Sequence, residues 1–338
     1  MKSIPVKQAV GMTLCHDVTR IVPDLFKGPV FKKGHIIRKE DIQTLLEIGK
    51  EHIYVASLDG GVHEDTAAER IATAAASSKL ALSDPCEGKV NFTASSPGLL
   101  KINVTALERI NTIPDIMFAT LHTDRCVKEG EQVAGTRIIP LTIHESRLKE
   151  VEQVCRECFP IVDVLPFSKH KVGLVTTGSE IFKGRIQDAF GPVLKRKFEE
   201  LGSSITRQIL VSDEIDRTVA AIHELIEEGA DMIAVTGGMS VDPDDRTPSS
   251  IRAAGGRIVS YGAPVLPGAM FMLAYIKDIP VIGLPGCVMY YKASIFDLVV
   301  PRLLAGDFVT ASEIAGMGHG GFCSNCRECR FPSCSFGK

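Results

Sequence analysis

Apolar and polar residues alternate in blocks through the second half of the chain. Runs rich in β-branched and other apolar residues at 171–177, 204–211, 232–236 and 280–284 end in glycine turns or polar segments. The stretch 216–228 lies between two of these runs and carries apolar residues at helical spacing, so we expect an amphipathic helix there. Apolar strands that alternate with amphipathic helices predict a parallel sheet covered on both faces, which is a three-layer α/β domain.

The first half has a mixed α+β pattern of short candidate strands and separate helices. Helices are expected at 39–48, 67–77, 105–111 and 145–158, a strand at 52–56, and mostly strands over 86–143. The second half adds expected helices at 191–202 and 289–304. We therefore divide the chain into an N-terminal α+β region at 1–168, which can hold two subdomains, an α/β domain at 169–306 and a tail at 307–338.

Composition narrows the function without naming it. A hydrophobic fraction of 45% is enough for buried cores, and a net charge of −3 gives no basic excess for nucleic-acid binding. No apolar run approaches the ~18 residues of a membrane helix. The first residues also lack the apolar stretch and cleavage site of a secretory signal. We therefore expect a cytoplasmic protein that has neither a nucleic acid nor a membrane as partner.

Several predicted strands meet small-residue turns. The turns read Thr-Thr-Gly-Ser-Glu at 176–180, Thr-Gly-Gly-Met-Ser at 236–240 and Leu-Pro-Gly at 284–286, and Leu-Pro-Gly-Ala at 266–269 precedes the strand expected at 271–276. Ligands of open parallel sheets bind beyond the carboxyl ends of the strands, where glycine backbone N–H groups can donate to phosphate. A single turn can equally be a plain β–α connection, but the set predicts a pocket for a phosphate-bearing ligand. Their order does not match a Rossmann or Walker motif.

Two carboxylates are candidates for chemistry near these turns. Asp188 follows the first turn, and Asp245 follows the second together with Asp242 and Asp244. Mg²⁺ binds one or two carboxylates plus phosphate oxygens, so Asp245 and its neighbours are candidate Mg²⁺ ligands. On spacing alone, loop solvation or helix capping is the more frequent role of such acids.

Residues 171–306 resemble the molybdopterin-binding domain that molybdopterin molybdenumtransferases, the gephyrin E domain and molybdopterin adenylyltransferases share. The similarity lies in TTGSEIFKGRIQD, VSDEIDRTVAAI, GADMIAVTGGMSVDPDD, PVIGLPG and the final helix ending in VVPRLLAG. These segments follow one another in family order with family-like spacing, and together they span about two fifths of the chain.

The resemblance implies a role in molybdenum-cofactor biosynthesis, insertion or delivery, with molybdopterin or adenylylated molybdopterin as ligand. It implies that Asp188 and Asp245 stand at the positions of the family's functional acids, where Asp245 would hold Mg²⁺. It also implies a homodimer, because family members pair and build the site across subunits. The pterin-phosphate contacts that it implies come from Thr177, Gly178, Ser179, Glu180, Gly237, Gly238, Ser240, Pro285 and Gly286.

The sequence departs from the transferase motifs at positions that would serve the chemical step of the transferase. Ala189-Phe190 replaces a Ser-Asn pair after the first acid, and Asp242 replaces a glycine. The turn at 267–270 lacks the lysine of Pro-Gly-Lys-Pro, and the turn at 284–288 lacks the asparagine of Leu-Pro-Gly-Asn-Pro. These losses remove charge and hydrogen-bond donors that would face phosphate. The β-barrel that follows the domain in the transferases also has no counterpart in 307–338.

Three functions therefore stay open. The first is a binding module that carries, stores or delivers the cofactor, and the departures favour it. The second is an active transferase that inserts molybdenum or tungsten into adenylylated molybdopterin, which the retained acids favour. The third is a sensor or regulatory protein that contacts molybdenum- or tungsten-dependent enzymes.

The tail carries a second chemical signal in its cysteines. Cys323, Cys326, Cys329 and Cys334 follow one another within a glycine-rich segment. Four thiolates suit tetrahedral Zn²⁺ or an iron–sulfur cluster, and the run is similar to ferredoxin ligation apart from a last gap that is one residue longer. Unligated thiols are the alternative. Cys287, in the turn at 284–288, can approach a metal–dithiolene or simply pack.

Overall fold

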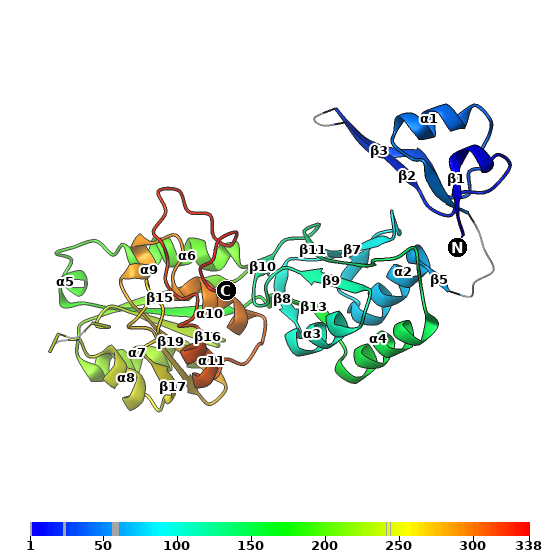
Figure 1. Cartoon of the computed structure of the whole chain (residues 1–338). Helices are drawn as coiled ribbons and strands as arrows, with labels where there is room; N and C mark the ends of the chain where they lie inside the picture. Colours follow the sequence, from blue (N-terminus) through cyan, green and yellow to red (C-terminus); the bar gives the residue numbers. More distant parts are fainter. Residues whose placement is uncertain (1, 23–24, 56–60, 241, 244) are drawn as a thin grey trace. The chain divides into compact units, whose positions relative to one another are not determined.

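The computed structural model describes residues 2–22, 25–55, 61–240, 242–243 and 245–338, and it divides the chain into two compact units (Figure 1). Unit 1 comprises Met1–Ser95, Ile102–Leu121 and Glu129–Asp163. Unit 2 comprises Ser96–Lys101, His122–Lys128 and Val164–Lys338. No helix of the described residues has both the length and the apolar character needed to cross a membrane.

Unit 2 is built on a six-stranded sheet with the strand order β15-β14-β16-β19-β18-β17. The strands are β14 (Lys171–Thr177), β15 (Ser204–Val211), β16 (Met232–Thr236), β17 (Arg257–Tyr261), β18 (Met272–Ile276) and β19 (Ile279–Leu284). β15, β14, β16 and β19 run parallel, as the sequence predicts. β18 runs antiparallel to both of its neighbours. The sheet is therefore mixed at one edge, because a two-residue turn at Lys277 and Asp278 joins β18 to β19 as a hairpin.

Helices cover both faces of this sheet, which confirms the three-layer α/β prediction (Figure 1). Alternate residues of β16 face opposite cores, with Met232 and Ala234 on one side and Ile233 and Val235 on the other. The first core is completed by α6 (Phe190–Glu200) and α10 (Ile295–Leu304), and the second by α7 (Ile215–Glu227) and α8 (Thr247–Ala253). Both faces of the central strands are buried, which explains their continuous apolar sequence.

The single helix expected at 289–304 is wrong, because the segment forms two helices. α9 (Cys287–Tyr290) ends at Tyr291, whose backbone is extended. α10 then begins after Ser294, where a capping box joins Ser294 and Asp297. The Asp297 carboxylate accepts from the Ser294 backbone N–H at 2.8 Å, which fixes a new helix start there. The short α5 (Ser179–Phe182) follows β14, and α11 (Ala311–Gly316) leads into the tail.

Unit 1 is a mixed α+β assembly, as expected. Its first part holds β1 (Lys2–Pro5), β2 (Val18–Val22), β3 (Phe26–Phe31), α1 (Asp41–Glu47) and β4 (His52–Val55) around a core of its own. β4 matches the predicted strand at 52–56, of which residue 56 lies outside the described residues. The next part has the sheet order β6-β7-β11-β9 with three helices. Its elements include α2 (Glu64–Ala75), β6 (Leu80–Leu82), β7 (Lys89–Ala94), α3 (Val104–Thr112), β9 (Ile116–Thr120), β11 (Gln132–Ile138) and α4 (Glu145–Cys158).

The helix boundaries of unit 1 show which local signals decide them. α4 coincides with the predicted range 145–158. α2 begins before the predicted range 67–77, because the His63 side chain caps it by accepting from the Asp65 backbone N–H at 3.2 Å. Histidine is an infrequent cap, so the sequence pattern did not indicate this start.

Candidate functional site

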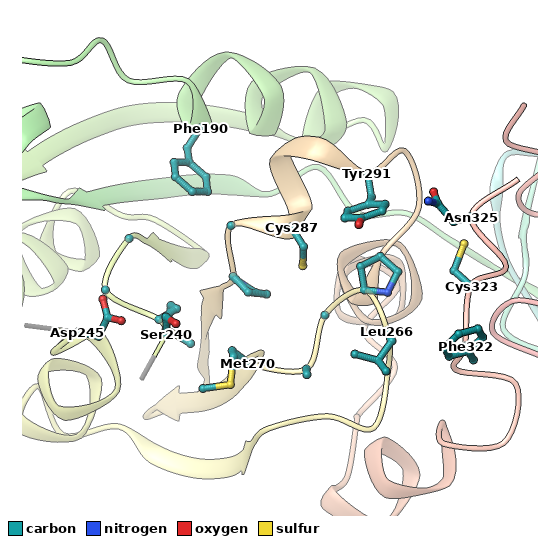
Figure 2. A pocket seen from close by; sticks show the side chains of 18 residues that line it. Phe190, Ser240, Asp245, Leu266, Met270, Cys287, Tyr291, Phe322, Cys323 and Asn325 are labelled. Carbon is teal, nitrogen blue, oxygen red and sulfur yellow. The ribbon is translucent and has the colours of Figure 1, made fainter. Parts of the chain in front are cut away.

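A cavity of about 630 Å³ opens at the carboxyl ends of β16 and β19 in unit 2 (Figure 2). Three loops and the tail contribute its walls. Asp245 and Ser240 lie at one end, and Phe322, Cys323 and Asn325 lie at the other (Figure 2). The cavity is lined by Phe190, Gly237, Gly238, Met239, Ser240, Asp245, Leu266, Pro267, Gly268, Ala269, Met270, Pro285, Gly286, Cys287, Tyr291, Phe322, Cys323 and Asn325.

The Gly237-Gly238 turn after β16 requires glycine for both conformation and space. The φ angles of the two residues are +82° and +54°, in the left-handed region. A Cβ on Gly237 would lie 2.1 Å from the Thr177 carbonyl oxygen, so the turns after β14 and β16 touch through backbone. Thr247 fixes the turn, since its hydroxyl donates to the Gly237 carbonyl at 2.7 Å and its N–H to the Gly238 carbonyl at 3.1 Å.

The same turn leaves donors for a ligand. In the described part of the chain, the backbone N–H groups of Gly237 and Gly238 have no hydrogen-bond acceptor. Both residues line the cavity, and the exposed Ser240 hydroxyl stands close by (Figure 2). Successive free N–H groups in such a turn form a concave site for an anion such as phosphate.

The turn after β19 is more permissive. Gly286 has an ordinary helical backbone, with φ −54° and ψ −27°. An added Cβ would find only the Phe190 ring within reach, at 4.0 Å. A larger side chain at Gly286 would therefore occupy cavity space without forcing the backbone to move. The neighbouring Cys287 is half-buried, and this burial raises the pKa of its thiol, which keeps the thiol protonated in the absence of a metal.

The loop that includes Pro267 and Gly268 connects the cavity to the tail. The Leu266 N–H donates to the Gly321 carbonyl at 2.8 Å, and the Cys323 N–H donates to the Leu266 carbonyl at 2.8 Å. This pairing places Phe322, Cys323 and Asn325 in the cavity wall. Sequence reasoning did not assign these three residues to the pocket, because nothing local indicates that the tail pairs with this loop.

Among the described residues that line the cavity, Asp245 is the one carboxylate, and none is Lys, Arg or His. Its carboxylate accepts from the Asp242 N–H at 3.1 Å, and its own N–H donates to the Asp242 carbonyl at 2.9 Å. The loop is thus closed on itself, with Asp245 at the cavity and Asp242 exposed. Asp244, also named as a candidate Mg²⁺ ligand, lies outside the described residues.

The predicted site residues divide into two groups. Gly237, Gly238, Ser240, Asp245, Pro285 and Gly286 line the cavity. Thr177 ends the neighbouring strand β14 and Gly178, Ser179 and Glu180 follow it, and none of the four lines the cavity. Part of that first turn already has partners, because the Ser179 N–H donates to the Asp213 carboxylate at 2.8 Å and the Gly178 N–H to the Val211 carbonyl at 3.2 Å. The role of these four residues in ligand binding stays a prediction.

Asp188 also lies apart from the cavity lining, and its carboxylate has three hydrogen bonds. It accepts from the backbone N–H groups of Phe190 and Gly191, each at 2.9 Å, at the start of α6. The Gln208 side-chain amide donates to Asp188 at 2.7 Å and to the Thr176 hydroxyl at 2.9 Å. These contacts position α6, whose first residue Phe190 does line the cavity. A catalytic role for Asp188 stays a prediction.

The four tail cysteines line a second cavity of about 270 Å³ in unit 2. Cys326 and Cys329 are exposed, and Cys323 and Cys334 are partly buried. Within the described ranges, no three side chains of His, Cys, Asp or Glu are gathered closely enough to hold a metal ion as they stand. The predicted Mg²⁺ and tail-metal sites therefore stay predictions.

Part of the chain is similar in sequence to a known protein family. Residues 173–305 match the family described as "Probable molybdopterin binding domain", and residues 3–57 match a domain of unknown function. A CinA-like protein of Mycobacterium avium (strain 104) is 34% identical over 77 residues, which cover 23% of this chain and 18% of that protein. The chain thus spans about a fifth of the length of the curated relatives that it matches.

Part of the chain is also similar to two solved structures. The molybdopterin biosynthesis enzyme MoaB from Thermus thermophilus is 21% identical, with 44% of this chain and 97% of that chain covered and a TM-score of 0.33. The tungsten cofactor synthesizing protein MoaB from Pyrococcus furiosus is also 21% identical, with 41% and 98% covered and a TM-score of 0.34. The family match spans β14 to α10, the elements that carry the cavity. Residues 173–305 are therefore similar to the probable molybdopterin-binding domain family over the elements that carry the cavity.

Proposed function

We propose that the cavity at the ends of β16 and β19 binds molybdopterin, as the free pterin phosphate or as the metal-loaded cofactor, in molybdenum-cofactor biosynthesis, insertion or delivery. The carrying observation is the Gly237-Gly238 turn, which lines the cavity and whose two N–H groups have no hydrogen-bond acceptor among the described residues. The volume of about 630 Å³ lies within the range of ~300–1,000 Å³ typical of small-molecule sites. The family match of residues 173–305 supports the identity of the ligand.

The two ends of the cavity suit the two ends of this ligand. The phosphate would bind at the Gly237-Gly238 turn, with the Ser240 hydroxyl as a further donor. The opposite end offers apolar and aromatic side chains, among them Tyr291 and Phe322, against which a flat ring can pack (Figure 2). Cys287 adds a thiol to the wall, which is a soft ligand suited to a metal–dithiolene.

Binding and delivery of the cofactor is the better supported role. The described lining has no basic side chain to neutralise phosphate, and Asp245 adds a negative charge. Transfer reactions at phosphate usually depend on Arg, Lys or Mg²⁺ to stabilise the developing charge. A carrier, storage or sensor protein needs affinity but no such stabilisation. Molybdenum- or tungsten-dependent enzymes are the partners that this role implies.

An active molybdopterin molybdenumtransferase is the second candidate, and the position of Asp245 favours it. A carboxylate at the phosphate end could hold Mg²⁺ between the protein and the phosphate oxygens. The cation would then replace the missing lysine. This mechanism predicts that insertion of molybdate into adenylylated molybdopterin requires both Mg²⁺ and Asp245.

A homodimer is part of the proposal, on the family resemblance alone. Pairing would allow a second copy to complete the site, for instance near the turn after β14, whose residues do not line the cavity of the single chain. Light scattering that finds a stable monomer at micromolar concentration would exclude this arrangement.

Substitution of Gly286 tests the proposed pocket with little risk to the fold. Gly286→Leu places a side chain in the cavity, while the backbone at this position accepts any residue. Gly316→Leu is the matched control, because Gly316 also has open space around it and does not line the cavity. Mass spectrometry of the anaerobically purified full chain should find the pterin phosphate with wild type and Gly316→Leu and at least ten times less with Gly286→Leu. Equal pterin content in all three proteins would refute the pocket.

A further inference from the structure

The tail forms a closed loop that is anchored in the core of unit 2. Near its two ends, the Gly337 N–H donates to the Gly320 carbonyl at 3.0 Å. A Cβ on Gly320 would lie 2.0 Å from the Lys338 carbonyl oxygen, so the ends meet backbone to backbone. Phe336 is only 3% exposed and belongs to the same core as α6 and α10. The loop is thus held at its base, although residues 323–338 form no helix or strand.

All four cysteines of this loop face one space. Cys323, Cys326, Cys329 and Cys334 line the cavity of about 270 Å³ within it. Cysteine is among the residue types most often buried, yet Cys326 and Cys329 are exposed. Core packing therefore does not explain these two thiols. Cys323 and Cys334 pack partly against the core of unit 2, and a common ligand in the cavity would explain why the two exposed thiols line it with them.

The charges around the cavity favour an anionic group inside it. Lys292, Arg327 and Arg330 line the cavity together with the cysteines, and the described lining contains no carboxylate. None of the three basic side chains has an ion pair within the described residues. Four metal-bound thiolates carry more negative charge than the metal cancels, so they would match the cations.

We propose that Cys323, Cys326, Cys329 and Cys334 ligate an iron–sulfur cluster in the tail loop. A single Zn²⁺ would need all four sulfurs at about 2.3 Å from one point. Among the described residues, no three such ligands are gathered around one point, whereas a cluster of several iron and sulfide atoms spans more of the cavity that the four thiols line than one ion does. The proposal does not depend on pterin binding, because it rests on the loop and its charges.

Metal analysis of the full chain tests the proposal directly. The protein is purified anaerobically, incubated with ferrous and ferric iron and sulfide, and freed of unbound metal. We expect about two or four iron atoms per chain with an equal amount of acid-labile sulfide, together with visible thiolate–iron absorbance. Zinc at one equivalent without iron would overturn the cluster, and so would a metal-free protein with four freely titrating tail thiols.

Two variants locate the ligands. Cys326→Ser combined with Cys329→Ser removes two exposed thiols, so the core of unit 2 should fold as before. This double variant should retain less than a tenth of the wild-type iron. Cys86→Ser, which changes an exposed cysteine of unit 1, should retain all of it. Full iron content in the double variant would refute the ligand assignment.

A measurement on the wild-type protein tests the same ligands and does not depend on the folding of the double variant. Alkylation of the native iron-loaded protein, read by peptide mass spectrometry, should modify the exposed Cys86 and spare the four tail cysteines. Removal of iron with a chelator should make Cys326 and Cys329 reactive. Rapid modification of these two residues in the loaded protein would overturn the proposal. Pterin content, measured on the same samples, reports separately on the proposed function.

Discussion

Replacement of Gly237 by alanine should destabilise unit 2, and the structure indicates by how much. The residue has φ +82°, where an L-residue costs roughly 1–2 kcal/mol. The new Cβ would also lie 2.1 Å from the Thr177 carbonyl oxygen. This contact is with backbone, which cannot rotate away, so overpacking adds about 1–3 kcal/mol. We therefore expect Gly237→Ala to lower the free energy of unfolding by about 2–5 kcal/mol.

The assay is urea unfolding followed by circular dichroism, with Gly316→Ala as the matched control. Gly316 is the last residue of α11 and has open space around it, so alanine there should leave stability unchanged or raise it by up to about 1 kcal/mol. A Gly237→Ala protein within about 0.5 kcal/mol of wild type would refute the reasoning, since ordinary surface substitutions stay within that range. The same result would mean that the turns after β14 and β16 do not touch as described.

Other parts of unit 2 allow three further predictions. Asp297→Ala should lower the free energy of unfolding by about 3–5 kcal/mol in urea, because it leaves the buried Lys197 ammonium without the partner that lies 2.7 Å away. The double variant Asp297→Ala with Lys197→Met, which removes both charges, should cost less. Burial alone would raise the pKa of the Glu313 carboxyl, yet hydrogen bonds from Thr310 and Arg302 lower this pKa to about 2. The ionised Glu313 carboxylate therefore stabilises the fold at pH values above its unfolded pKa near 4.5. The side chain is 42% exposed, so solvent screening reduces this contribution to about 1 kcal/mol. The contribution should disappear as the pH falls from 4.5 to 2, and it should be missing in Glu313→Gln. If the chain is an active transferase, Asp245→Ala should abolish molybdate insertion in a discontinuous assay while pterin content stays near wild type.

The sequence predicted the α/β domain well because its signals are local. Apolar strands, amphipathic helices and glycine turns each depend on neighbouring residues, and β14, β16 and β19 lie where the pattern placed them. The break between α9 and α10 also had a local signal, because Ser294 and Asp297 have capping-box spacing. The expected helix at 289–304 ignored that signal. The antiparallel hairpin of β18 and β19 was missed because its two-residue turn carries no glycine.

The candidate site was predicted only in part, for a physical reason. Residues at strand ends, such as Gly237 and Gly286, are placed by the sheet itself. Phe322 and Asn325 reach the cavity through backbone pairing of the tail with Leu266, far away in sequence. No periodicity encodes such a contact. Asp188 shows the opposite case, because its hydrogen bonds to the start of α6 are local, while its predicted role came from family resemblance.

The two proposals have a joint consequence that can be argued from shared residues. Tyr291, Cys323 and Asn325 line both the large cavity and the tail cavity. A cluster bound to Cys323 would therefore fix part of the wall against which the pterin packs. Binding at two sites that stabilise the same arrangement is coupled, and the coupling is reciprocal. A tail without its cluster should thus bind the pterin more weakly, and bound pterin should slow the loss of iron to a chelator by the same linkage.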